Sequence, residues 1–105
     1  MKSCITCSMP FEGNHANDVG METEWGPVCK FDSENGQMKS PEQIFAGGIH
    51  FFMLQAAPGD RNLAERLTRS NMKRLPYWQE HHFVMLEGEE ATREEFASAL
   101  TKIGE

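Results

Sequence analysis

The sequence predicts a small α+β domain, and three observations support that prediction. All three cysteines of the 105-residue chain fall within its first 29 residues, in a segment rich in turn-forming residues. Beyond residue 40, apolar residues recur at helical spacing. Capping patterns mark the starts of about three helices in that second part. We therefore expect an N-terminal segment with a short β-hairpin to pack on a small helical body, in one compact domain.

The N-terminal segment, residues 1–40, is poor in leucine, isoleucine and valine and carries several Gly, Asn, Asp and Glu residues. Residues 21–24 and 27–29 have extended character on either side of Trp25-Gly26, which predicts a hairpin. Fixing each backbone residue costs about 1–2 kcal/mol of conformational entropy. Because so few side chains can be buried here, we expect another interaction to order this segment.

Residues 41–78 are predicted to contain two helices. Ser40 and Gln43 form a capping box around Pro41, so the first helix should run from residue 41 to about 57. Asp60 is the expected cap of the second helix, which should end near Leu75.

Two glycines lie within the first of these helices. Gly47 and Gly48 each cost a helix about 1 kcal/mol relative to alanine, so close packing against a neighbour should compensate. The apolar run at residues 51–54 is too wide for one buried helix face. It favours an exposed patch for a partner, such as a second copy of the chain.

Residues 79–105 are predicted to contain a short strand and a C-terminal helix. The strand should cover residues 81–86, and a Glu-Gly-Glu turn should follow it. Thr92 and Glu95 form a second capping box that opens the last helix.

The cysteine spacing predicts a metal site in the N-terminal segment. Cys4-x-x-Cys7 places two thiols where both can bind one tetrahedral ion, and Cys29 can supply a third. Asp32 lies three residues after Cys29, which gives the pattern C-x2-C…C-x2-D, and a carboxylate is an accepted zinc ligand. His15, in the loop between these pairs, is the competing fourth ligand, with water or another group as a further alternative. Zinc is the expected ion, although the oxygen ligand also permits iron or another divalent metal.

Several short motifs together resemble one protein family. They are Cys4-x-x-Cys7-x-Met-Pro, Gly20-Met21-Glu22, Cys29-Lys30-Phe31-Asp32 and Asn35-Gly36. Residues 4–45 are similar to the bacterial zinc-ribbon family of small proteins, which has a fourth cysteine at the position of Asp32. The resemblance implies a zinc ribbon, or knuckle, with Cys4, Cys7 and Cys29 as ligands, and it implies no activity.

Two other uses of the thiols are less favoured. A thioredoxin-like redox pair would follow a strand at the start of a helix, whereas Cys4 and Cys7 stand at the beginning of the chain. A copper site could combine them with Met9, since all three ligands are soft, but Met9-Pro10 better fits the start of a ribbon.

The charge pattern bears on partners and location. The net charge is −6, yet residues 61–74 carry five basic side chains and one acidic one, while residues 79–105 carry seven glutamates. An acidic chain is a poor general nucleic-acid binder, although the basic face of the second helix could contact phosphates. The sequence has no apolar run near the ~18 residues of a membrane helix and no secretory signal, so we expect a cytoplasmic protein.

These patterns predict a function only in outline. We expect a structural zinc ion in a protein-interaction or regulatory module. The alternative is a transcription-related nucleic-acid-binding protein. A metal-dependent enzyme is the third reading, which would need an open coordination position at the metal.

Overall fold

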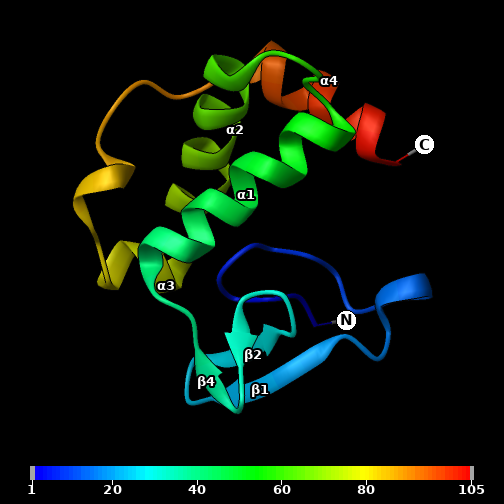
Figure 1. Cartoon of the computed structure of the whole chain (residues 1–105), viewed down its shortest axis with the longest axis vertical. Helices are drawn as coiled ribbons and strands as arrows, with labels where there is room; N and C mark the ends of the chain where they lie inside the picture. Colours follow the sequence, from blue (N-terminus) through cyan, green and yellow to red (C-terminus); the bar gives the residue numbers. More distant parts are fainter. Residues whose placement is uncertain (1, 105) are drawn as a thin grey trace.

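The computed structural model describes residues 2–104. Residue 1 of the predicted N-terminal segment and residue 105 of the predicted C-terminal segment lie outside the described residues. Two small β-hairpins occupy the N-terminal part and four α-helices the remainder, which confirms the α+β prediction. Figure 1 shows the N-terminal segment lying beneath the helices as a layer of its own. None of the helices in residues 2–104 combines the length and the apolar character that crossing a membrane requires.

The first hairpin forms where the sequence predicts it. Strand β1 (Val19–Thr23) pairs with β2 (Gly26–Cys29) in antiparallel register, with an irregularity between Val19 and Met21. Gly20 lies at that irregularity, where a Cβ would be 2.1 Å from the Ser33 hydroxyl oxygen. Only a residue without a side chain allows the chain to pass so closely.

A second hairpin was not expected from the sequence. Strands β3 (Ser33–Glu34) and β4 (Gln37–Met38) are joined by Asn35 and Gly36, whose φ angles are 54° and 77°. Both residues are in the left-handed region, as a two-residue hairpin loop of this kind requires. The Asn-Gly pair was therefore a usable hairpin signal.

The three long helices begin where their caps predict. Helix α1 (Pro41–Gln55) starts after Ser40, helix α2 (Arg61–Lys73) after Asp60, and helix α4 (Arg93–Gly104) after Thr92. Both predicted capping boxes are formed. Each cap hydroxyl accepts from the backbone N–H three residues on, and the backbone N–H of Ser40 or Thr92 donates to the side chain of Gln43 or Glu95.

The predicted strand at residues 81–86 is wrong. Helix α3 (Pro76–Glu80) precedes this stretch, and a 3-10 turn, η2, covers Val84–Leu86. Its polar backbone groups are satisfied without a partner strand: the amide of Leu86 donates to Phe83, and Arg69 donates to the carbonyl of Met85. An alternating pattern forms a strand only where another strand can pair with it.

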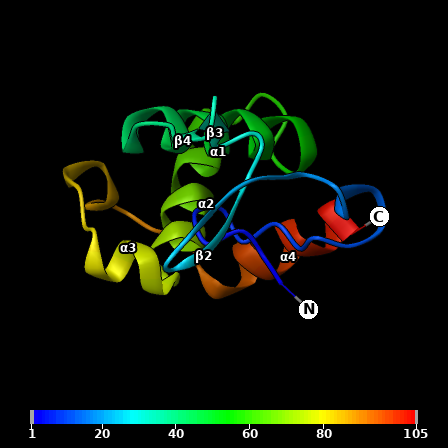
Figure 2. The ribbon, with the colours of Figure 1, turned by 90° about the horizontal axis from the view of Figure 1, so that it is seen from below.

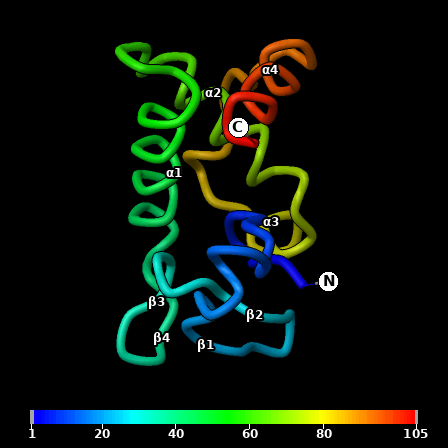
Figure 3. The backbone as a smooth tube through the Cα atoms, turned by 90° about the vertical axis from the view of Figure 1, so that its right-hand side faces the viewer, coloured from blue at the N-terminus to red at the C-terminus, as the bar shows by residue number. Residues whose placement is uncertain are grey.

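Most of the core is formed by residues of the helices, whose arrangement is shown in Figures 2 and 3. Trp78 lies in this core and is 2% exposed. Twelve buried residues form the cluster: Ile44, Phe45, Ile49, Phe52, Ala56, Ala57, Ala64, Leu67, Met72, Trp78, Leu86 and Ala99.

Candidate metal centre

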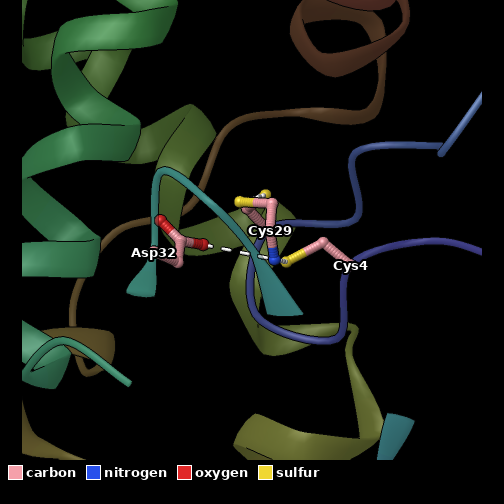
Figure 4. Close-up of side chains that lie close together, drawn as sticks. Cys4, Cys29 and Asp32 are labelled. Atoms are coloured by element: carbon pink, nitrogen blue, oxygen red, sulfur yellow. Dashed lines mark hydrogen bonds between the residues drawn. The ribbon is translucent and has the colours of Figure 1, made fainter. Parts of the chain in front are cut away.

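The four predicted ligands come together in the structure. Cys4 and Cys7 lie on the turn that follows the first residues, Cys29 ends β2, and Asp32 lies in the turn before β3. One ligand atom from each residue lies within 4.8 Å of the other three. Figure 4 shows Cys4, Cys29 and Asp32 directed toward one another from separate segments. The group is positioned to hold a metal ion.

Two of the separations between ligand atoms are close to those of tetrahedral coordination. The Sγ atoms of Cys7 and Cys29 are 3.7 Å apart, and Cys4 Sγ lies 3.9 Å from Asp32 Oδ2. Bonds of about 2.3 Å to zinc would place tetrahedral sulfurs about 3.8 Å apart. Cys4, Cys29 and Asp32 are buried, and Cys7 is partly exposed, so the centre is largely shielded from solvent.

Two groups in the structure hold Cys4 in place. The backbone amide of Cys29 lies 3.2 Å from Cys4 Sγ and donates to it. The hydroxyl of Thr6 lies 3.1 Å from the same sulfur and donates to Asp32 Oδ2 at 2.7 Å. Thr6 is fully buried, and it therefore connects a thiol ligand with the carboxylate ligand.

Proton affinities in the group are strongly coupled. The Cys29 and Cys7 thiols donate hydrogen bonds to Cys4 and lower its pKa to about 2. Contact with Cys4 raises the pKa of Cys29 to about 12. Contacts with Cys29 and then with Cys4, together with burial, raise the pKa of Cys7 above its ordinary value. Burial raises the pKa of Asp32. Without an ion these groups share protons, and a bound divalent cation would replace those protons.

The cysteine turn is fastened to the helical body by side chains far away in sequence. The indole of Trp78 donates to the carbonyl of Thr6 at 2.9 Å, and the amide of Asn71 donates to the carbonyl of Cys7 at 2.9 Å. Asn71 also accepts from the hydroxyl of Ser8 at 2.8 Å. Ser8 has a φ of 66°, and this contact helps to hold that left-handed conformation after Cys7.

The alternative ligands lie elsewhere. His15 is part of a short 3-10 turn, and its Nδ1 is 2.8 Å from Asp18 Oδ2. Lys30 contacts the other oxygen of Asp18 at 3.1 Å. Within residues 2–104, the potential metal-binding group contains the three cysteines and Asp32 and does not include His15.

Sequence reasoning missed three residues that shape the centre. Thr6 lies between the first two cysteines, where a buried hydroxyl facing a carboxylate ligand has no spacing signature of its own. Asn71 follows Leu67 by one helical turn, so a polar residue on an apolar face was an available signal. Trp78 is buried, and its indole N–H needs an acceptor, which the Thr6 carbonyl supplies.

Three comparisons with known proteins identified no relative of this chain. The chain matches no protein-family model, and the searches of curated proteins and of solved structures found no significant match.

Proposed function

We propose that this chain is a small zinc-binding protein of the zinc-ribbon type, in which the ion is structural and the helical body binds a protein partner in the cytoplasm. The convergence of Cys4, Cys7, Cys29 and Asp32 within 4.8 Å supports the proposal most strongly. Three sulfurs and one carboxylate form a donor set that suits zinc.

A structural role follows from the number of ligands. Four protein ligands complete a tetrahedral shell, whereas catalytic zinc retains a position for water or substrate. The burial of Cys4, Cys29 and Asp32 favours the same role, because a substrate needs access to the ion. Tethering of the cysteine turn to Asn71 and Trp78 indicates what the ion would stabilise, namely the contact between the two parts of the chain.

The contacts of α2 give the nucleic-acid alternative no support. Arg66 pairs with Glu95 and lies 3.8 Å from Glu89, and Lys73 is 2.9 Å from Glu90. These basic side chains are neutralised by the acidic C-terminal segment, so they are poor candidates for contacting phosphates. Binding to generic DNA that weakens steeply with salt would nevertheless revive that alternative.

Metal analysis tests the proposal. Protein purified without added metal should carry one zinc per chain, and cobalt substitution should give the visible bands of tetrahedral thiolate coordination. Asp32→Cys should tighten zinc binding, because a fourth thiolate replaces a harder ligand. Asp18→Cys is the matched control, since Asp18 is a buried carboxylate that contacts His15 and Lys30. Equal zinc affinity in wild type and Asp32→Cys would show that Asp32 is not a ligand.

A further inference from the structure

The outer face of α1 is exposed and uncharged. Residues 43–55 contain no Asp, Glu, Lys or Arg. Figure 3 shows α1 along one edge of the molecule, with the other helices on its inner side. Five exposed residues at helical spacing form what we call the α1 face: Gln43, Gly47, His50, Phe51 and Leu54.

The two glycines of α1 have different surroundings. A Cβ on Gly48 would lie 2.7 Å from Thr68 Cγ2, so close packing of α1 on α2 accounts for that glycine. A Cβ on Gly47 would meet no atom within 4 Å. Gly47 therefore costs helix stability, by about 1 kcal/mol relative to alanine, and no packing contact within residues 2–104 requires it.

The two large apolar side chains of the α1 face are prominent. Leu54 is 66% exposed and Phe51 is 45% exposed, and the Phe51 ring rests against Phe52 with centroids 5.4 Å apart. Leu54 lies two helical turns from Gly47 on the same face. The face thus presents a protruding side chain at Leu54 and, seven residues earlier, a position without a side chain at Gly47.

We propose that α1 pairs with α1 of a second copy of the chain, antiparallel about a two-fold axis between His50 and Phe51. Leu54 of each copy then fills the space above Gly47 of the other. This inference rests on the proposed role as a protein-interaction module and names the partner.

Charge favours a second copy as the occupant. A two-fold interface brings each residue near its own counterpart, so a charged face would bring like charges together. Two copies with a net charge of −6 repel one another, and pairing through the α1 face adds no like-charge contact to that repulsion. A partner of opposite charge would find no ionised side chain on this face to pair with.

The length of the helix limits the affinity. A helix of 15 residues is about 22 Å long. A contact of that length buries an area toward the low end of the range for specific interfaces. We therefore expect a dissociation constant of order micromolar.

Sedimentation equilibrium tests the dimer. We expect wild type to pass from monomer to dimer between roughly 1 and 500 µM. Leu54→Glu should raise the dissociation constant by at least about tenfold, because it places paired negative charges in the interface. Leu100→Glu, at a side chain 47% exposed on α4, is the matched control and should leave it unchanged.

Gly47→Leu separates dimerisation from folding. Because position 47 is open, this variant should fold at least as stably as wild type, with higher helix propensity, yet lose dimerisation. A wild type that stays monomeric throughout this range overturns the proposed dimer. A dimer unaffected by both Leu54→Glu and Gly47→Leu overturns the assignment to this face.

Cross-linking tests the register. Treated with a short thiol cross-linker, His50→Cys, next to the two-fold axis, should give covalent dimers. Gln43→Cys should not, and wild type sets the background from the native thiols. Efficient cross-linking of Gln43→Cys alone would overturn the antiparallel pairing. Zinc content measured on the same samples keeps the two proposals separate: a monomer that carries zinc overturns only the dimer, and protein that binds no zinc overturns the proposed metal site.

Discussion

The N-terminal segment, residues 2–40, and the helical body, residues 41–104, are held together by different interactions. The helical body has a cluster of twelve buried apolar residues. The N-terminal segment has a separate buried cluster of three, Cys4, Val28 and Cys29, and two of these are proposed metal ligands. Burial of apolar side chains is thus sufficient to explain order in one region and insufficient in the other.

A segment with few buried apolar side chains can be ordered by hydrogen bonds to a well-packed neighbour. Hydrogen bonds from Asn71 and Trp78 fix the backbone of the cysteine turn against α2 and α3. The proposed ion would fix the same turn to Cys29 and Asp32. We therefore expect damage to the metal centre to disorder the N-terminal segment alone and damage to the helical core to affect both regions.

The largest effect should follow loss of the ion. Cys29→Ser, or removal of zinc with a chelator, should disorder residues 2–40 while the helices remain folded. Structural zinc contributes about 10–16 kcal/mol in zinc-finger peptides, far more than three buried side chains supply. Hydrogen exchange by mass spectrometry should show lost protection in β1 and β2 and retained protection in α1 and α2.

A neighbouring substitution provides the control. Phe31→Ser alters a side chain that is 55% exposed in the same loop, and it should retain both zinc and protection. Full protection of residues 2–40 in metal-free Cys29→Ser protein would contradict the comparison, because the segment would then be ordered without the ion.

A smaller effect should follow a cavity in the helical core. Leu67 is fully buried in α2, and Leu67→Ala should destabilise the fold by about 2–5 kcal/mol. Urea unfolding followed by circular dichroism measures this loss. The zinc stoichiometry of the folded fraction should be unchanged, since Leu67 belongs to the helical cluster and Cys4 and Cys29 belong to the other cluster. Loss of zinc from folded Leu67→Ala protein would show that the metal centre depends on the packing of the helical core.

The attachment between the regions can be weakened directly. Asn71→Ala removes the donor to the Cys7 carbonyl and the acceptor for Ser8, at a cost of about 1–3 kcal/mol. Exchange in residues 2–10 should increase while zinc remains bound. Asn62→Ala is the matched control on the same helix. Asn62 is exposed, and its side chain accepts a hydrogen bond from Arg66. Equal effects of the two variants would remove Asn71 from the attachment.

Local signals predicted the fold well where the cause of the structure is local. Ser40, Asp60 and Thr92 each cap the helix they were expected to cap, because capping depends on residues within one turn. The strand at residues 81–86 could not be judged locally, since its alternative depended on Arg69 in another helix satisfying the Met85 carbonyl. Helix α3 was missed because its five residues are too few for periodicity to show.

The metal centre likewise has features that depend on nearby residues and features that depend on distant ones. The spacing predicted a shared site for Cys4, Cys7, Cys29 and Asp32, because two intervening residues let each pair bind one ion. The contact of Asn71 with Cys7 spans 64 residues and depends on how the helices pack against the N-terminal segment. No spacing in a single sequence specifies that arrangement.

The smallest effect concerns the ion pairs that attach the acidic C-terminal segment to α2. Arg66 donates to Glu95 and lowers the pKa of that carboxyl below its ordinary value of 4.5. A depressed pKa means that the pair stabilises the fold above about pH 4.5, and that the contribution disappears as the pH falls through the folded-state pKa. Glu95→Gln should therefore lower the melting temperature slightly at pH 7 and leave it unchanged at low pH.

The choice of glutamine makes this test specific to charge. Glutamine at position 95 can still accept from the backbone of Thr92, so the capping box is retained. Glu94→Gln removes a charge from the same helical turn, so the difference between the two variants isolates the pair with Arg66. An equal shift for both variants at pH 7 would assign the effect to the charge at the helix start. Zinc content should not change in either variant, because these ion pairs belong to the helical body alone.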